Sequence, residues 1–378
     1  MAAKVAVPKE IRPGERRVAI NPSVAERLAK LGVTVLLQRG AGEAAQIPDH
    51  DYGDAVEIIA EAEALYAQAE IVLKVQAPTI EEIGWMRECT VVISHLSPHQ
   101  EPDRIAALRD RKLTAFAMEL IPRISRAQTM DALSSQAAVA GYKAAIMGAH
   151  LSNRFFPMLT TAAGTIRPAQ VLVIGAGVAG LQAIATSRRL GAIVEAYDVR
   201  AATKEQVQSL GAKFLETKVA AEGEGGYARE LTDEENSQEQ EMLAHHVAKA
   251  HVVITTAAIP GRPSPKIIPA QMVEGMQPGA VIIDLAAEGG GNCEQSMPGE
   301  TVIHRGVTIY APLNVPSQVP YHASEMYAKN LLSFLQPMLA DGAWKPDWND
   351  EVIAKSMLTH EGRIKHEPTR KHVEGEQE

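Results

Sequence analysis

Cysteine, aromatic residues and long apolar runs are scarce in this sequence of 378 residues. Its only cysteines, Cys89 and Cys293, lie far apart, which excludes a disulfide-stapled secreted domain and favours a reducing compartment. Apolar runs such as 171–174 and 281–283 end long before the roughly 18 to 20 residues that cross a bilayer. The N-terminus has no apolar secretory region. We therefore expect a cytoplasmic protein.

An excess of positive charge is also missing. Lys plus Arg number 37 against 46 for Asp plus Glu, and a formal net charge of −9 does not suit nucleic-acid binding. The sequence has no Gly-x-Ser-x-Gly elbow, which removes support for a serine hydrolase of that type. His245, His246 and His251 lack the spacing of a metal site, so we expect no metal centre.

The composition that is present is that of a globular α/β protein. Hydrophobic residues make up 46% and charged residues 22%, and the length suits two lobes. Short β-rich runs alternate with helical patterns, which predicts mostly parallel sheets. The first expected helix is 22–31, with Asn21 as N-cap, Pro22 in its first turn and Gly32 after its end. The expected strands are 4–7, 33–38, 71–75, 91–94 and 113–117, then 170–174, 193–197, 252–255, 281–285 and 307–310.

Two long helical patterns divide the chain. A periodic stretch from 130 to about 151 predicts a connecting helix, and 321–339 predicts a helix that returns the chain to the first lobe. We expect two doubly wound Rossmann-like lobes separated by a cleft. The first comprises 1–126 plus 328–378, and the second comprises 127–327.

The apolar pattern fails between Thr217 and Gln240. A Gly- and Glu-rich run containing Tyr227 is followed by Asp233-Glu234-Glu235. Long polar segments inside compact domains are often functional loops. We predict an exposed mobile loop near 217–240.

The sharpest motif is a glycine fingerprint after the strand 170–174. Gly175 permits a tight turn, Gly177 lets the backbone approach a pyrophosphate, and Gly180 lets helix and strand pack closely. Asp198 follows about 20 residues later at the end of the next strand, as dinucleotide sites require. Its carboxylate would accept hydrogen bonds from ribose hydroxyls and repel a 2′-phosphate, which favours NAD(H) over NADP(H).

Other strand ends near this motif are ambiguous. Arg200 is either a ligand contact or a solvated charge, and the small residues of 255–261, Ala257 among them, would let backbone approach the cofactor. The glycine run 289–291 is either a flexible turn or a wall of the site. Asn314 either binds a nicotinamide carboxamide or makes an Asx turn.

A polar segment, 123–136, separates two apolar stretches. Taken alone, it is more typical of a solvated helix start. If it faces the cofactor, Gln128, Asp131 and Ser134 fall at roughly helical spacing and would offer an amide, a carboxylate and a hydroxyl from one helix face.

Together these motifs resemble a known family along nearly the whole chain. The sequence resembles the soluble NAD(H)-binding domain I, the separate alpha subunit, of proton-translocating nicotinamide nucleotide transhydrogenase. The stretches that carry this resemblance are 7–10, 13–19, 118–136, 175–180, 198–206, 225–227 and 314–317.

The resemblance implies roles for particular residues. Arg123, Gln128, Asp131 and Ser134 would form a catalytic loop around the nicotinamide, while Asp198 holds the adenosine ribose and Tyr227 closes over the nucleotide. The implied cofactor-binding residues are Gly175, Gly177, Val178, Gly180, Asp198, Val199, Arg200, Tyr227, Ala257 and Asn314. Direct hydride transfer between two nicotinamides needs no side-chain acid or base, so the lack of a catalytic triad agrees with this interpretation.

The resemblance also implies partners. A single glycine fingerprint with a downstream acid holds NAD(H), so NADP(H) would sit as second substrate on another subunit. A homodimer of this chain, an NADP(H)-binding subunit and membrane-spanning subunits that conduct protons are implied. The chain would then be peripheral on the inner membrane.

Alanine dehydrogenases are the rival interpretation. Arg17, Lys74 and His95 match positions at which those enzymes hold substrate and transfer a proton. Glu288 replaces their Asp before Gly-Gly, however, and the polar loop 123–134 and Tyr227 favour the transhydrogenase. A nucleotide-sensing module without catalysis is the third hypothesis.

Overall fold

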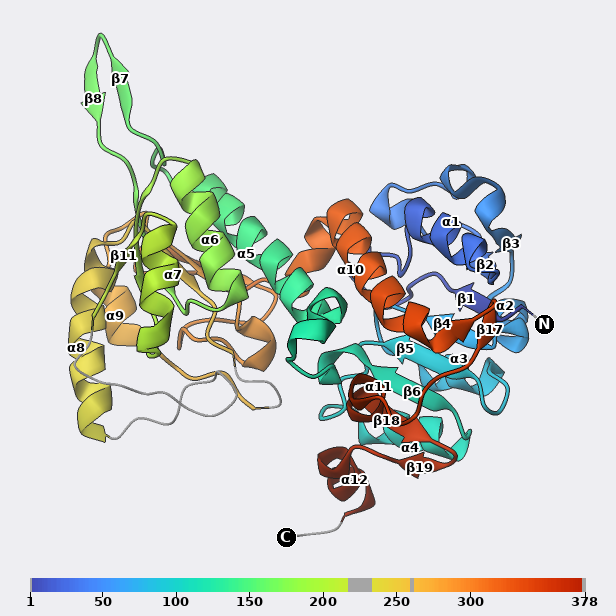
Figure 1. Cartoon of the computed structure of the whole chain (residues 1–378). Coiled ribbons are helices and arrows are strands. Elements are labelled where there is room, and N and C mark those ends of the chain that lie inside the picture. Colours follow the sequence, from blue (N-terminus) through green and yellow to red (C-terminus); the bar gives the residue numbers. More distant parts are fainter. Residues whose placement is uncertain (1, 217–232, 259–261, 376–378) are drawn as a thin grey trace. The chain divides into compact units, whose positions relative to one another are not determined.

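The computed structural model describes residues 2–216, 233–258 and 262–375 (Figure 1). The chain divides into two compact units. Unit 1 comprises Met1–Gln136 and Ser317–Glu378, and unit 2 comprises Ala137–Pro316. Helix α5 (Ala132–Leu151) begins in unit 1 and continues into unit 2.

Unit 1 is built on a mostly parallel sheet with strand order β19-β18-β6-β5-β4-β1-β2-β3. The strands from β3 to β6 pair in parallel, and β18 joins β6 antiparallel. Strands β5 and β6 are buried along their whole length, as expected for a sheet covered on both faces. The strands are β1 (Lys4–Val7), β2 (Thr34–Gln38), β3 (Glu57–Ile59), β4 (Ile71–Leu73), β5 (Val91–Ser94), β6 (Thr114–Ala117), β18 (Met357–His360) and β19 (Arg363–Ile364), with a separate pair β16 (Leu339–Ala340) and β17 (Ala343–Trp344).

Helices cover this sheet from both ends of the chain. Asn21 caps α1 by accepting a hydrogen bond from the Val24 N–H, which confirms the predicted helix start. The α-helices are α1 (Pro22–Lys30), α2 (Ala62–Gln68), α3 (Ile80–Trp85), α4 (Pro102–Asp110), α10 (Pro320–Leu335), α11 (Glu351–Ser356) and α12 (Glu367–Glu374). The 3-10 helices are η1 (Glu43–Ala45), η2 (Asp49–Ala55), η3 (Met118–Leu120), η4 (Ser125–Met130) and η9 (Gln336–Met338).

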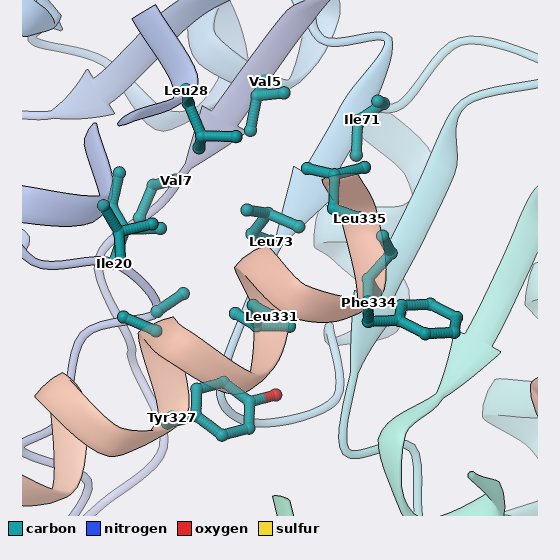
Figure 2. Packing of buried hydrophobic residues seen from close by; sticks show 14 of the residues in the cluster. Val5, Val7, Ile20, Leu28, Ile71, Leu73, Tyr327, Leu331, Phe334 and Leu335 are labelled. Atoms are coloured by element: carbon teal, nitrogen blue, oxygen red, sulfur yellow. The ribbon is translucent and has the colours of Figure 1, made fainter. Parts of the chain in front are cut away.

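Helix α10 supplies much of the core of unit 1. Figure 2 shows Leu331, Phe334 and Leu335 of α10 packed in one cluster with Val7 and Leu73 from the central strands. The sequence prediction that this helix returns to the first lobe is therefore confirmed. Burial of such side chains stabilises a fold by about 1.5 to 3 kcal/mol each relative to exposure.

The boundary between the units differs from the predicted one because polar contacts continue past residue 126. The Gln136 Nε2 donates to the Ala323 carbonyl oxygen, so the first turns of α5 stay with unit 1. The Ser317 hydroxyl donates to the Gly14 carbonyl oxygen, so unit 1 resumes before the predicted residue 328.

Unit 2 has a sheet of order β11-β10-β9-β12-β13-β15-β14, parallel except for β14. Strand β9 lies between β10 and β12, so the strand order reverses beside it, which is where doubly wound folds bind nucleotides. The strands are β9 (Gln170–Ile174), β10 (Ile193–Tyr197), β11 (Lys213–Phe214), β12 (Val252–Thr255), β13 (Val281–Asp284), β14 (Thr301–His304) and β15 (Val307–Tyr310), with a hairpin of β7 (Leu159–Thr161) and β8 (Gly164–Ile166). The helices are α6 (Val178–Arg189), α7 (Lys204–Ser209), α8 (Asp233–Lys249), α9 (Ala270–Glu274), η5 (Ala201–Thr203), η7 (Ala287–Gly289) and η8 (Val315–Gln318), which ends in unit 1.

Helix α8 corrects a portion of the predicted loop. Residues 217–232, with Tyr227, lie outside the described residues, but 233–240 are helical rather than looped. Leu243 and Val247 bury only the later turns of α8. The earlier turns are rich in Glu and Gln, which form helix well in solvent and leave no apolar stripe for a sequence pattern to detect.

Within the described ranges, no helix is both long and apolar enough to cross a membrane.

Candidate NAD(H) site

The fingerprint forms a tight strand-loop-helix turn at the end of β9. Gly175 has φ of +94°, a conformation that favours glycine. A Cβ on Gly180 would lie 1.8 Å from the Gly175 carbonyl oxygen, so only glycine fits where α6 crosses the turn. A Cβ on Gly177, by contrast, would meet no atom within 4 Å. Packing explains the first and third glycines, while Gly177 borders open space at the N-terminus of α6.

Asp198 is coupled directly to this turn. Its carboxylate accepts the Ala176 N–H at 2.7 Å and pairs with the Arg200 side chain through Nε at 2.9 Å and Nη2 at 2.8 Å. Burial alone would raise the pKa of Asp198, but the hydrogen bonds from Arg200 and Ala176 hold it below its usual value. The side chain is therefore an anion placed beside the glycine turn, where it can accept ribose hydroxyls.

Arg200 lies against Asp198 rather than free in solvent. A ribose at Asp198 would share that carboxylate with the guanidinium or displace it. Val178 is 43% exposed in the first turn of α6, and Val199 is half-buried after β10. Both residues therefore leave apolar surface near the turn.

The loop after β12 packs under the fingerprint. The Thr256 hydroxyl donates to the carbonyl oxygens of Ile174 at 3.3 Å and Gly175 at 3.1 Å. Ala257 is fixed differently from the expectation that its backbone faces the cofactor. Its N–H donates to Asn292 Oδ1 at 3.0 Å, and its carbonyl oxygen accepts from Asn292 Nδ2 at 2.7 Å. Sequence reasoning missed Asn292, because nothing local marks an asparagine that bonds a loop 35 residues away.

The glycine run 289–291 is a packed turn. A Cβ on Gly289 would lie 2.3 Å from Ser264 Oγ, and one on Gly291 would lie 2.6 Å from Asp284 Oδ2. The Gly289 and Gly291 N–H groups both donate to the Ala286 carbonyl oxygen. These contacts contradict the interpretation of a flexible turn.

Asn314 has φ of +45°, a left-handed conformation that asparagine tolerates better than most residues. Its backbone N–H donates to Glu288 Oε1 at 3.1 Å. This contact links the ends of β13 and β15, and it places Glu288 against the turn in which Asn314 lies.

In unit 1, the polar segment is a 3-10 helix followed by a capped α-helix. Arg123 and Gln128 are exposed, and η4 ends at Met130. Asp131 then accepts the Ser134 N–H at 2.8 Å and the Ser134 hydroxyl at 2.6 Å, which caps α5. The expectation that Gln128 shares a helix face with Asp131 and Ser134 is wrong, because Gln128 belongs to η4 and the α-helix begins after the cap.

Helix α10 braces this segment. Asn330 donates through Nδ2 to the Thr129 carbonyl oxygen at 2.9 Å and accepts the Ser135 hydroxyl at 2.6 Å. Arg126 pairs with Asp350 at 2.7 Å. The contacts come from residues about 200 positions away in sequence, so the sequence alone could not reveal them.

The arginine that matches a dehydrogenase substrate position is engaged by the protein itself. Glu15 accepts from Arg17 Nε at 2.8 Å and Nη2 at 2.7 Å, and Gln136 Oε1 accepts from Arg17 Nη1 at 2.9 Å. Burial opposes ionisation of Glu15, but the Arg17 hydrogen bonds and charge lower its pKa to about 2. An added carboxylate substrate would compete with this buried bidentate pair.

Lys74 is likewise surrounded by carboxylates. Its Nζ lies 2.9 Å from Glu82 Oε1 and 3.4 Å from Glu10 Oε2, and all three side chains are buried. Burial raises the pKa of Glu10, an effect that the nearby Lys74 only partly offsets. Acidic groups outnumber the lysine in this cluster, so it disfavours another anion.

His95 completes the set of dehydrogenase-like residues. Its Nδ1 lies 3.6 Å from Glu119 Oε2, and its ring centroid lies 5.3 Å from that of Tyr327. Burial opposes ionisation of Glu119, but His95 lowers the pKa of that carboxyl. Among the residues that the structure describes, no group of three or more His, Cys, Asp or Glu side chains is placed to hold a metal ion.

Comparison with known proteins agrees with this geometry. The family model "Alanine dehydrogenase/PNT, N-terminal domain" matches residues 6–140, and "Alanine dehydrogenase/PNT, C-terminal domain" matches residues 144–367. A solved transhydrogenase structure from Sinorhizobium meliloti has a TM-score of 0.88 and 44% identity, covering 96% of this chain and 99% of that one.

Curated relatives separate the two branches. An NAD(P) transhydrogenase subunit alpha of Rhodospirillum rubrum is 49% identical, covering 96% of this chain and 98% of the relative. Alanine dehydrogenase of Mycolicibacterium smegmatis is 30% identical, covering 98% and 96%. The chain therefore belongs to the alanine dehydrogenase/PNT family, on the branch of the NAD(P) transhydrogenase alpha subunits.

Proposed function

We propose that this chain holds NAD(H) on unit 2 and presents it for direct hydride exchange with NADP(H) bound to a partner subunit. The observation that carries the proposal is the pairing of open space at Gly177 with the anionic Asp198, on a chain that matches a transhydrogenase alpha subunit along nearly its whole length. The backbone N–H groups at the start of α6 suit a pyrophosphate.

The chemistry asks little of the side chains. When bound, the dihydronicotinamide supplies hydrogen with its bonding electron pair to the oxidised ring of the second nucleotide, so one C–H bond breaks, another forms, and NADH is oxidised while NADP⁺ is reduced. The protein orients the rings and excludes water. Arg123, Gln128, Asp131 and Ser134 are proposed to surround the nicotinamide end, with Asp131 already held by its bonds to Ser134.

The remaining cofactor contacts follow the same interpretation. Asp198 and Arg200 are proposed to meet the adenosine ribose, and Val178 and Val199 to contact the nucleotide through their apolar side chains. Ala257 would present its surface rather than its engaged N–H. Tyr227 and Asn314 are proposed to complete the site.

Alanine dehydrogenation is the second candidate, supported by the presence of Arg17, Lys74 and His95. The structure argues against it, because Glu15 engages Arg17 and two carboxylates surround Lys74. A 2-oxo acid would have to displace buried carboxylates from both cations, which costs several kcal/mol for groups of this kind.

A mixing assay tests the function. The purified chain should reduce an NADP⁺ analogue from NADH only after an NADP(H)-binding transhydrogenase subunit is added. Alanine and NAD⁺ should give no NADH. Alanine-dependent NADH formation by the chain alone would favour the dehydrogenase, and NADH binding without transfer in the complete mixture would favour a nucleotide sensor.

We also propose that two copies pair through the β7–β8 hairpin, which Figure 1 shows projecting from the rest of unit 2. Leu159 pairs with Ile166 across the hairpin, and Met158 and Ile166 are 62% and 49% exposed. An isolated two-stranded hairpin is only marginally stable in water, and exposed apolar side chains favour a covering partner.

Charge placed on the hairpin should therefore separate the copies. Leu159→Asp combined with Ile166→Asp is expected to convert a dimer into a monomer by light scattering after size exclusion, because burying a charge costs much more than burying leucine. Thr160→Asp on the alternate face is the matched control. A monomeric unsubstituted chain at micromolar concentration would refute the hairpin interface.

The proposed membrane coupling rests on partners. Proton conduction is assigned to membrane-spanning subunits, and this chain would reach the inner membrane only by binding them.

A further inference from the structure

Asn292 is a buried side chain that joins three loops of unit 2. It is 0% exposed and follows the glycine turn after β13. Its Oδ1 accepts the Ala257 N–H, and its Nδ2 donates to the carbonyl oxygens of Ala257 at 2.7 Å and Pro265 at 2.9 Å. The orientation of the amide follows from its partners, since an N–H only donates and a carbonyl oxygen only accepts.

The amide continues the work of the sheet beyond its edge. The ladder between β12 and β13 ends at Thr255 and Asp284, and the Leu285 N–H still donates to the Thr255 carbonyl oxygen. Ala257 lies two residues further, where Asn292 bonds both of its backbone polar groups. A side-chain amide thus satisfies a residue that would otherwise need a neighbouring strand.

Ala257 in turn touches the fingerprint. A Cβ built on Gly175 would lie 3.3 Å from the Ala257 N and 2.5 Å from Thr256 Oγ1. The first glycine of the nucleotide turn therefore rests on residues 256 and 257. A shift of a few tenths of an ångström in this loop would move the surface under the turn.

Asn292 is itself held firmly. Its carbonyl oxygen accepts the N–H groups of Ile267 at 2.8 Å and Ile268 at 3.0 Å. The preceding Gly291 packs against Asp284, and the Cys293 N–H donates to Asp284 Oδ2 at 2.9 Å. The backbone on both sides of the amide is fixed, so its side chain is aimed at Ala257.

We propose that Asn292 is a positioning residue for NAD(H), acting through Ala257 and Gly175 rather than by touching the nucleotide. This inference rests on the proposed function of unit 2 as the NAD(H) site. It assigns the glycine turn 289–291 a purpose, which is to deliver the amide to the end of β12.

Asn292→Asp separates positioning from simple stability. The new carboxyl keeps an acceptor for the Ala257 N–H but turns its second oxygen toward two carbonyl oxygens, so the ionised form is repelled and its pKa is raised. Protonation restores one donor. We expect NAD⁺ affinity to fall about tenfold at about pH 9, as for loss of a buried hydrogen bond, and to recover as the pH is lowered to about 6.

Two further variants complete the experiment, read by calorimetric titration with NAD⁺ and by thermal unfolding. Asn292→Ala should lose affinity at every pH, without recovery. Ser264→Ala removes the hydrogen bond from Ser264 to the Ala286 carbonyl oxygen in the same turn, and it should lower stability without lowering affinity. The unsubstituted chain should bind equally over this range, because the pKa of Asp198 is already lowered.

Each outcome is decisive. Affinity that stays at the unsubstituted level in Asn292→Asp and Asn292→Ala overturns the positioning role, as does an equal affinity loss in Ser264→Ala. If Asn292→Asp does not fold, Asn292→Ala decides by the same comparison. Failure of the unsubstituted chain to bind NAD⁺ removes the proposed function itself, and the inference with it.

Discussion

Gly177→Ala should leave the fold intact and weaken NADH binding by at least about tenfold, because a methyl group would occupy the space that a pyrophosphate needs. Gly177 has φ of −74° and ψ of −170°, which alanine adopts readily. Its Cβ position meets no atom within 4 Å, so the substitution creates no clash within unit 2. The expected cost to stability is only that of a poorer helix N-cap, up to about 1 kcal/mol.

Gly180→Ala is the matched comparison. Its Cβ would lie 1.8 Å from a backbone oxygen of the turn, so α6 must move and unit 2 should lose stability. Thermal unfolding and NADH titration by fluorescence should thus give opposite patterns for the two glycines. Unchanged NADH affinity in a folded Gly177→Ala protein would falsify the assignment of the pyrophosphate to this turn.

The features that sequence predicted well are those with a local cause. Strands such as β9 and β12 are short apolar runs, and Asn21 marks the start of α1 three residues before the N–H it caps. The fingerprint and Asp198 are a motif whose spacing is set by one strand, one turn and one helix. The predicted parallel α/β architecture is therefore confirmed in both units.

The features that sequence missed depend on contacts between distant segments. Gly141 looks ordinary in a helical pattern, yet its Cβ would lie 2.0 Å from the Ala179 carbonyl oxygen. Helix α5 therefore crosses the fingerprint helix α6 at a glycine that no local pattern identifies. Asn292 is similar, because its value comes from Ala257 and Pro265 rather than from its neighbours in sequence.

The polar segment 123–136 shows both outcomes. Its composition indicated a helix start, and Asp131 does cap α5. Its division into η4 and α5, however, is accompanied by bonds from Asn330 of α10, and these depend on the tertiary fold. The proposed role at the nicotinamide thus needs a test in which capping and charge are separated.

Asp131→Asn provides that test, and it should lower the rate of hydride transfer about tenfold to a hundredfold. As hydride leaves NADH, positive charge develops on its ring, and a nearby carboxylate stabilises that state more than the ground state. Asparagine caps helices as well as aspartate does, so the bond from the Ser134 N–H can persist and stability should change little. The single-turnover rate should fall far more than NADH affinity.

The control is Asp49→Asn, which removes another carboxylate of unit 1 whose oxygens accept the Gly40 N–H at 2.9 and 3.1 Å. Asp49 lies in η2, outside the polar segment, and its substitution should leave the transfer rate unchanged. Stopped-flow mixing with the NADP(H)-bearing partner measures both variants. Equal losses of rate and affinity in Asp131→Asn would make Asp131 an ordinary binding contact, while unchanged values for both would place the charge of Asp131 away from the reacting ring.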